Sequence, residues 1–129
     1  MAEALLQAGN SQLNVSSAGI GALVGHPADP IAIELMSEQG IDISAHRGRQ
    51  LTPEVGAGSD LILAMDRGHL DWINRNFPQF RGRVHLLLSW PEQGDVPDPY
   101  RAPRAAFEKS LALIQVGVDA WLEKLRGMR

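Results

Sequence analysis

The side chains that could do chemistry in this sequence are few, and their types and spacing exclude several kinds of site. The chain has no cysteine, so it holds no disulfide, no thiolate metal site and no thiol nucleophile. Its four histidines are His26, His46, His69 and His85, separated by 20, 23 and 16 residues. None of these intervals presents two ligands on one face of a helix. We therefore expect no metal ion and no other cofactor.

Glycines between residues 19 and 25 invite comparison with a phosphate-binding loop. They follow a short strand-like stretch, LNVSSAG, and their spacing in GIGALVG is G-x-G-x-x-x-G. A dinucleotide-binding loop opens a helix directly at its glycines, whereas His26-Pro27 delays the next helix here. The stretch therefore predicts a loop that binds no dinucleotide.

Three aspartates remain as candidates. Asp29 precedes Pro30, and Asp66 follows an apolar run, so each can cap the first turn of a helix. Asp98 precedes Pro99 in the polar stretch PEQGDVPDPYRAP, and an Asp-Pro pair alone usually indicates a turn. From the residues alone, Asp98 can be a turn residue or an acid.

The elements that must position these side chains alternate between strands and helices. Apolar runs predict strands at residues 13–19, 60–65 and 83–90. Caps and stop signals predict helices over residues 1–9, 30–40 and 66–78, with a short helix starting at Thr52. The clearest helix carries Phe107, Leu111, Ile114, Val118, Trp121 and Leu125 on one face, which we interpret as core packing. This alternation predicts an α/β fold with a parallel sheet, helices on both faces and a single domain over residues 1–129.

The first helix begins without the features that usually precede one. No capping residue stands ahead of Met1, and the strand and loop that open a doubly wound sheet are absent before it. Either the end frays or a preceding segment is missing.

Composition narrows the class of protein. With 44% hydrophobic residues, 21% charged residues and a net charge of −3, the chain is typical of a globular protein and has no general basic field for nucleic acid. It has no apolar run long enough to span a bilayer, and its first residues lack the charged-then-apolar order of a signal peptide. We expect a cytoplasmic protein without membrane insertion.

Six stretches stand in order along the chain: SAGIGALVG, ADP, AHRGRQL, DLILAMD, FRGRVHLL and DVPDPY. Together, over residues 1–125, they resemble the low-molecular-weight protein-tyrosine phosphatases. The likeness is greatest to bacterial members that act on tyrosine autokinases of capsule and exopolysaccharide export. In that family a central strand and a C-x5-R-S phosphate loop precede the residues that match Met1 to Leu6. The resemblance therefore implies an N-terminally truncated phosphatase domain.

The resemblance implies a covalent mechanism, for which this chain contains the acid but not the nucleophile. A C-x5-R loop directs backbone N–H groups at one phosphate and lowers the pKa of its cysteine, whose thiolate attacks phosphorus. Family members then protonate the leaving tyrosine with the Asp of DPY, which is Asp98 here, while the aromatic that matches Tyr100 walls the pocket. Because the nucleophile is absent, we expect this chain to be inactive.

Four further residues receive roles from the same resemblance. Leu23 and His26 lie in the loop where the family varies and contact the substrate. His46 matches a histidine behind the phosphate loop, and Asp66 matches a carboxylate near the site. An oriented core histidine and a helix cap are alternative interpretations of these last two residues. Arg101 and Arg104 could attract an acidic phosphopeptide, or they could form a solvated basic rim.

Two other functions stay open at this stage. The chain could be a non-catalytic remnant that binds a kinase or another partner. A thioredoxin-coupled arsenate reductase shares the fold but needs further cysteines, and this sequence has none.

A missing central strand would also leave unpaired peptide groups at a cost of about 1 to 3 kcal/mol each, so we expect a marginally stable or aggregation-prone chain.

Overall fold

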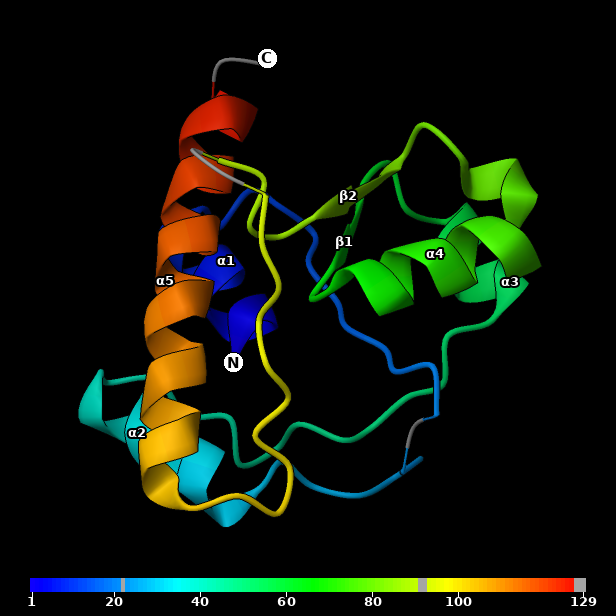
Figure 1. Ribbon diagram of the computed structural model, residues 1–129. Helices are drawn as coiled ribbons and strands as arrows, with labels where there is room; N and C mark the ends of the chain where they lie inside the picture. The colour runs from blue at the N-terminus through cyan, green and yellow to red at the C-terminus, as the bar shows by residue number, and fades with distance from the viewer. Residues whose placement is uncertain (22, 91–92, 127–129) are drawn as a thin grey trace.

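Strands and helices alternate from β1 onward, as the sequence pattern predicts, whereas the described residues before β1 form three helices in succession. The structure is a computed structural model, which describes residues 1–21, 23–90 and 93–126 (Figure 1). Its helices are α1 (Ala2–Gly9), α2 (Pro30–Glu38), α3 (Pro53–Ala57), α4 (Arg67–Asn76) and α5 (Arg104–Arg126), with a 3₁₀ turn η1 (Pro78–Phe80). Its strands are β1 (Ile62–Ala64) and β2 (Val84–Leu86). No helix in these ranges is both long and apolar enough to cross a membrane.

Side chains cap the starts of three helices. Asp29 and Asp66 confirm the predicted caps, and the short helix predicted to start at Thr52 is also present. Asp29, Thr52 and Asp66 each accept a backbone N–H group from the first turn of the helix that follows, at 2.8, 3.3 and 2.8 Å. By contrast, α1 begins at Met1 without a hydrogen bond from a capping side chain. Local side-chain chemistry therefore decides where α2, α3 and α4 begin.

The sheet joins β1 and β2 in parallel, with Ile62 opposite Val84 and Ala64 opposite Leu86. Side chains that alternate along β1 enter two different cores: Ile62 packs with the cluster of α4 and η1, and Leu63 packs against the larger cluster. In Figure 1, α4 lies on one side of the strands and α5 on the other. This arrangement confirms the predicted α/β fold with a parallel sheet and helices on both faces.

The strand predicted at residues 13–19 was wrong. Residues 14–18 run without regular structure, and no strand pairs with them in the part of the chain that the structure describes. Gly19, at the end of this segment, makes a strand-like pairing with the segment at residues 49–51. The side chain of Gln7 holds the segment instead, because it donates to Leu13 O at 2.6 Å and accepts from Val15 N–H at 3.2 Å. An apolar run becomes a strand only where a neighbouring backbone completes its hydrogen bonds.

The predicted strands at residues 60–65 and 83–90 shorten to three residues each, because the ladder that joins them pairs only Ile62–Ala64 with Val84–Leu86. The predicted core face of α5 is confirmed. Phe107, Leu111, Ile114, Val118 and Trp121 are all buried, and Trp121 Nε1 donates to Leu86 O at 3.1 Å. That bond fixes α5 to the end of β2.

Candidate functional site

A proline-rich loop at residues 93–103 lies at the carboxyl end of β1, where open α/β sheets bind their ligands. The loop is attached there by Val96 N–H, which donates to Met65 O at 2.8 Å. Asp95 Oδ1 also accepts the N–H of Arg67 in the first turn of α4, at 3.0 Å. These bonds hold the 93–103 loop, and Asp98 within it, beside the end of the sheet.

Asp98 is exposed and forms a tight local turn. Its Oδ1 accepts the N–H of Tyr100 at 3.0 Å, and Pro99 O accepts the N–H of Ala102 at 2.8 Å. Its other carboxylate oxygen, Oδ2, has no hydrogen bond from any described residue. The turn and acid interpretations of Asp98 are therefore compatible, because one oxygen shapes the turn and the other faces solvent.

The residues after Asp98 add an aromatic face and a cation. Tyr100 is 54% exposed, and the guanidinium carbon of Arg101 lies 5.2 Å from the centre of its ring. Arg101 has φ +62°, a left-handed conformation that residues other than glycine rarely adopt and that often occurs at functional sites. Both side chains are available to an incoming ligand.

The loop that contains Leu23 and His26 is exposed and is attached to a different segment. Gly25 N–H donates to Gly48 O at 2.9 Å, and Gly48 N–H donates to His26 O at 2.8 Å. A Cβ at Gly48 would contact Leu23 O, so this close backbone pairing requires glycine. Among the described residues, no hydrogen bond or ring contact joins Leu23 or His26 to Asp98.

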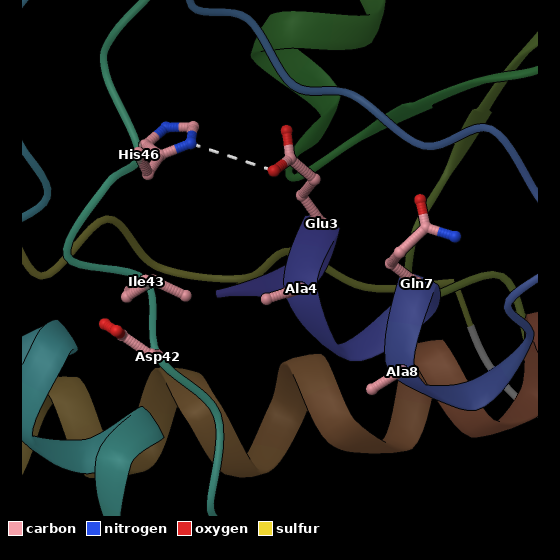
Figure 2. Close-up of a pocket in the computed structure, with 7 residues that line it drawn as sticks. All are labelled: Glu3, Ala4, Gln7, Ala8, Asp42, Ile43 and His46. Carbon is pink, nitrogen blue, oxygen red and sulfur yellow. Dashed lines mark ion pairs between the residues drawn. The ribbon is translucent and has the colours of Figure 1, made fainter.

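His46 faces α1 across a shallow groove of about 360 Å³ (Figure 2). Its Nδ1 lies 3.7 Å from Glu3 Oε2, and Glu3 Oε1 accepts the hydroxyl of Ser17 at 2.9 Å. Asp42, on the same groove, accepts the N–H of Ser44 at 2.8 Å, and the Ser44 hydrogen bonds lower the pKa of Asp42. His46 thus places the segment at residues 44–50 opposite the first turn of α1.

Asp66 and Arg104 are occupied by structural contacts. Asp66 caps α4 and lies 3.5 Å from His69 Nδ1, as the helix-cap interpretation predicts. The guanidinium of Arg104 binds three carboxylates, those of Glu34, Glu38 and Glu108, at 2.6, 2.7 and 2.8 Å. The hydrogen bonds from Glu38 and Glu108 raise its pKa above the ordinary value. Arg104 therefore joins α5 to α2 rather than offering a free cation.

Sequence reasoning missed three residues that organise this region. Glu3 and Asp95 make the contacts described above, and Ser110 donates to Pro97 O at 2.8 Å. An acidic residue in the first turn of a helix is the available signal for Glu3. A serine among the apolar residues of α5 is the signal for Ser110. No local signal identifies Asp95, because it caps a helix 28 residues earlier.

The α-amino group of Met1 lies at the start of α1, next to the large core. Burial lowers its pKa, and the nearby charge of Glu3 opposes this shift. Met1 packs against the same apolar cluster as Leu5 and Leu6. The start of α1 is therefore part of the packed structure.

Comparison with known proteins gives a consistent result. The family model described as low molecular weight phosphotyrosine protein phosphatase matches residues 1–128. A probable low molecular weight protein-tyrosine-phosphatase EpsP of Ralstonia nicotianae is 48% identical over 128 residues, which cover 99% of this chain and 88% of that relative.

Two solved structures have the same fold. Wzb of Vibrio vulnificus in complex with benzylphosphonate has a TM-score of 0.91 and 38% identity, over 95% of this chain and 87% of the other. The tyrosine phosphatase Wzb from Escherichia coli K30 in complex with sulphate has a TM-score of 0.92 and 36% identity, over 96% of this chain and 87% of the other. Sequence and fold therefore point to the same group of proteins.

Proposed function

This chain belongs to the low molecular weight phosphotyrosine protein phosphatase family, and we propose that its fold serves the hydrolysis of phosphotyrosine in proteins with Asp98 as the general acid. The main support is the bond from Val96 N–H to Met65 O, which holds the 93–103 loop at the carboxyl end of β1. One oxygen of Asp98 shapes the loop, and the other is open to a ligand.

An acid is needed because of the leaving group. A tyrosine leaves as a phenolate with a pKa of about 10 unless a proton reaches the bridging oxygen. A carboxylic acid at that oxygen accelerates such a step by about 10² to 10⁴. We propose that Asp98 gives this proton, that Tyr100 packs on the substrate ring, and that Leu23 and His26 contact the substrate from the neighbouring loop. His46 and Asp66 support the site by orienting its segments.

The covalent half of the reaction needs a group that this chain does not contain. In the family mechanism a thiolate attacks phosphorus, the tyrosine oxygen leaves with the proton from the acid, and water then hydrolyses the phosphocysteine. The 129-residue sequence has no cysteine. We propose that this chain by itself does not release phosphate.

The proposed biological setting extends the family resemblance. We propose a cytoplasmic phosphatase domain, spanning residues 1–129, whose substrate is a phosphotyrosine protein, a bacterial tyrosine autokinase of polysaccharide export. The relatives EpsP and Wzb, named as low molecular weight protein-tyrosine-phosphatases, support the phosphatase part of this proposal.

The first test uses the chain as it stands. The 129-residue protein is incubated with a phosphotyrosine peptide, and free phosphate is measured. We expect no release above the rate of buffer alone. Measurable turnover would show that a nucleophile other than cysteine acts in this fold.

The second test supplies the missing chemistry. A chimera places an apolar strand and a C-x5-R-S loop ahead of Met1, and we expect it to hydrolyse phosphotyrosine. In the chimera, Asp98→Asn should lower turnover of tyrosine phosphates by about 10² or more, with a smaller loss for phosphates whose leaving group needs no proton. Equal losses for both substrates would remove Asp98 from the acid role.

The absence of cysteine favours one alternative, a non-catalytic protein that binds a phosphotyrosine partner. Titration calorimetry with the same peptide distinguishes the two. Binding without phosphate release would favour the alternative, and the absence of both binding and release would argue against it.

A further inference from the structure

A buried hydroxyl lies directly beneath the 93–103 loop. Ser110 is 1% exposed, and it is the one polar residue that is buried among residues 1–21, 23–90 and 93–126. Its neighbours on the buried face of α5 include Phe107, Leu111 and Ile114. A hydroxyl among apolar side chains is unfavourable without a hydrogen-bond partner, so the partner indicates its role.

The partner of Ser110 belongs to the loop and not to the helix. A serine inside a helix commonly bonds to a carbonyl in the preceding turn of the same helix. Ser110 Oγ instead donates to Pro97 O at 2.8 Å, 13 residues earlier in the chain. Pro97 O belongs to the peptide group that joins Pro97 to Asp98. The hydrogen bond from Ser110 therefore fixes the orientation of that peptide group.

Two prolines restrict the backbone on either side of Asp98, so the orientation of the Pro97–Asp98 peptide group also determines the position of Asp98. Pro97 has a restricted φ, and Pro99 restricts the backbone of Asp98, the residue that precedes it, to an extended conformation. Little backbone freedom remains between the anchored carbonyl and the Asp98 side chain. Its carboxylate also accepts the N–H of Tyr100 at 3.0 Å, which selects one side-chain direction.

Two other hydrogen bonds attach the 93–103 loop at residues that precede Pro97. Val96 is held by Met65 O, and Asp95 is held by the N–H of Arg67. Neither bond involves the peptide plane of Asp98. We propose that Ser110 is a positioning residue for Asp98, which it orients through Pro97; the importance of this orientation for catalysis rests on the proposed acid role of Asp98.

The test measures the direction of the Asp98 side chain in the 129-residue protein by nuclear magnetic resonance. Two matched pairs of proteins distinguish the effect of the hydroxyl from the effect of side-chain shape. The first pair is wild type and Ser110→Ala, and the second is Ser110→Thr and Ser110→Val. Three-bond couplings report the χ1 rotamer of Asp98, and amide exchange reports the Tyr100 N–H. Ser59→Ala is the control, since it removes a hydroxyl that bonds to Val55 O at 3.4 Å, within α3 and its C-terminal turn.

We expect one Asp98 rotamer in the two proteins that keep the hydroxyl and averaged couplings in the two that lose it. The Tyr100 amide should exchange about fivefold faster in the Ala and Val variants, while the Val96 amide keeps its rate. Equal acceleration at Tyr100 and Val96 would show a general loss of stability and would overturn the proposal. Unchanged Asp98 couplings, or failure of both the Ala and Val variants to fold, would also overturn it in favour of a purely structural serine. Neither readout involves phosphate transfer, so the result is independent of whether the chimera is active.

Discussion

Replacement of Gly117 by alanine should destabilise the protein, although alanine is the better helix former. Gly117 lies in the interior of α5, where alanine would gain about 1 kcal/mol from helix propensity alone. In the structure, a Cβ at Gly117 would lie 2.8 Å from both the Cγ and the backbone oxygen of Leu87. Ordinary contacts of a Cβ begin at 3.4 Å, so the added methyl group overlaps the segment that follows β2.

The size of the effect follows from how little Leu87 can move. Leu87 is 0% exposed, and its N–H donates to Ala64 O at 2.8 Å. Because one clash is with a backbone atom, the overpacking cost should lie near the upper end of the usual range of about 1 to 3 kcal/mol. After the gain in propensity, the net loss in the free energy of unfolding is about 2 kcal/mol. That loss lowers the Tm of a domain of this size by about 6 to 10 °C.

The assay is thermal and urea unfolding of Gly117→Ala, followed by far-ultraviolet circular dichroism. Val116→Ala is the matched control, because Val116 is the preceding residue of α5 and is 51% exposed. The control should change the free energy of unfolding by no more than about 0.5 kcal/mol. A Gly117→Ala protein as stable as wild type, or more stable, would refute the close packing of α5 on Leu87.

Three further predictions concern caps and charges. Hydrogen bonds from Ser44 lower the pKa of Asp42. The carboxylate therefore stabilises the fold above its unfolded pKa of about 4 and loses that effect as the pH falls through its folded pKa. Asp42→Asn should reduce the loss of stability that urea unfolding measures between about pH 5 and pH 2. Arg104→Ala leaves the three carboxylates that it bridges facing one another, so its Tm should fall at low salt, and the difference from wild type should shrink at about 1 M NaCl. An unchanged Tm at low salt would show that the cluster adds nothing. Asp29→Ala removes the cap of α2 and should cost about 1 kcal/mol in urea unfolding with an unchanged m-value, whereas Asp29→Ser should retain most of the stability.

Features that depend on neighbouring residues were predictable from the sequence. The predicted caps Asp29 and Asp66 lie within three residues of the N–H groups they accept, and the structure confirms both. The buried face of α5 repeats with the period of a helix, and it is confirmed as well. The family resemblance was also visible in the sequence, because its motifs lie in order along the whole chain.

Features that depend on a distant partner were not predictable in this way. Residues 13–19 have the composition of a strand, but in the described structure the Gln7 side chain holds this segment and no second backbone pairs with residues 14–18. Arg104 reads as a free cation in the sequence, and the fold surrounds it with carboxylates from α2 and α5.

The candidate site shows the same division. The sequence by itself determined which residues could act, since the presence of Asp98 and Tyr100 and the absence of cysteine are properties of the chain. Only the tertiary structure decided how Asp98 is held, because three distant residues bond to the 93–103 loop: Met65 directly after β1, Arg67 in α4 and Ser110 in α5. The physical reason is that a cap or an apolar stripe is completed within a few residues, whereas a loop is fixed by partners that only folding brings into hydrogen-bond distance.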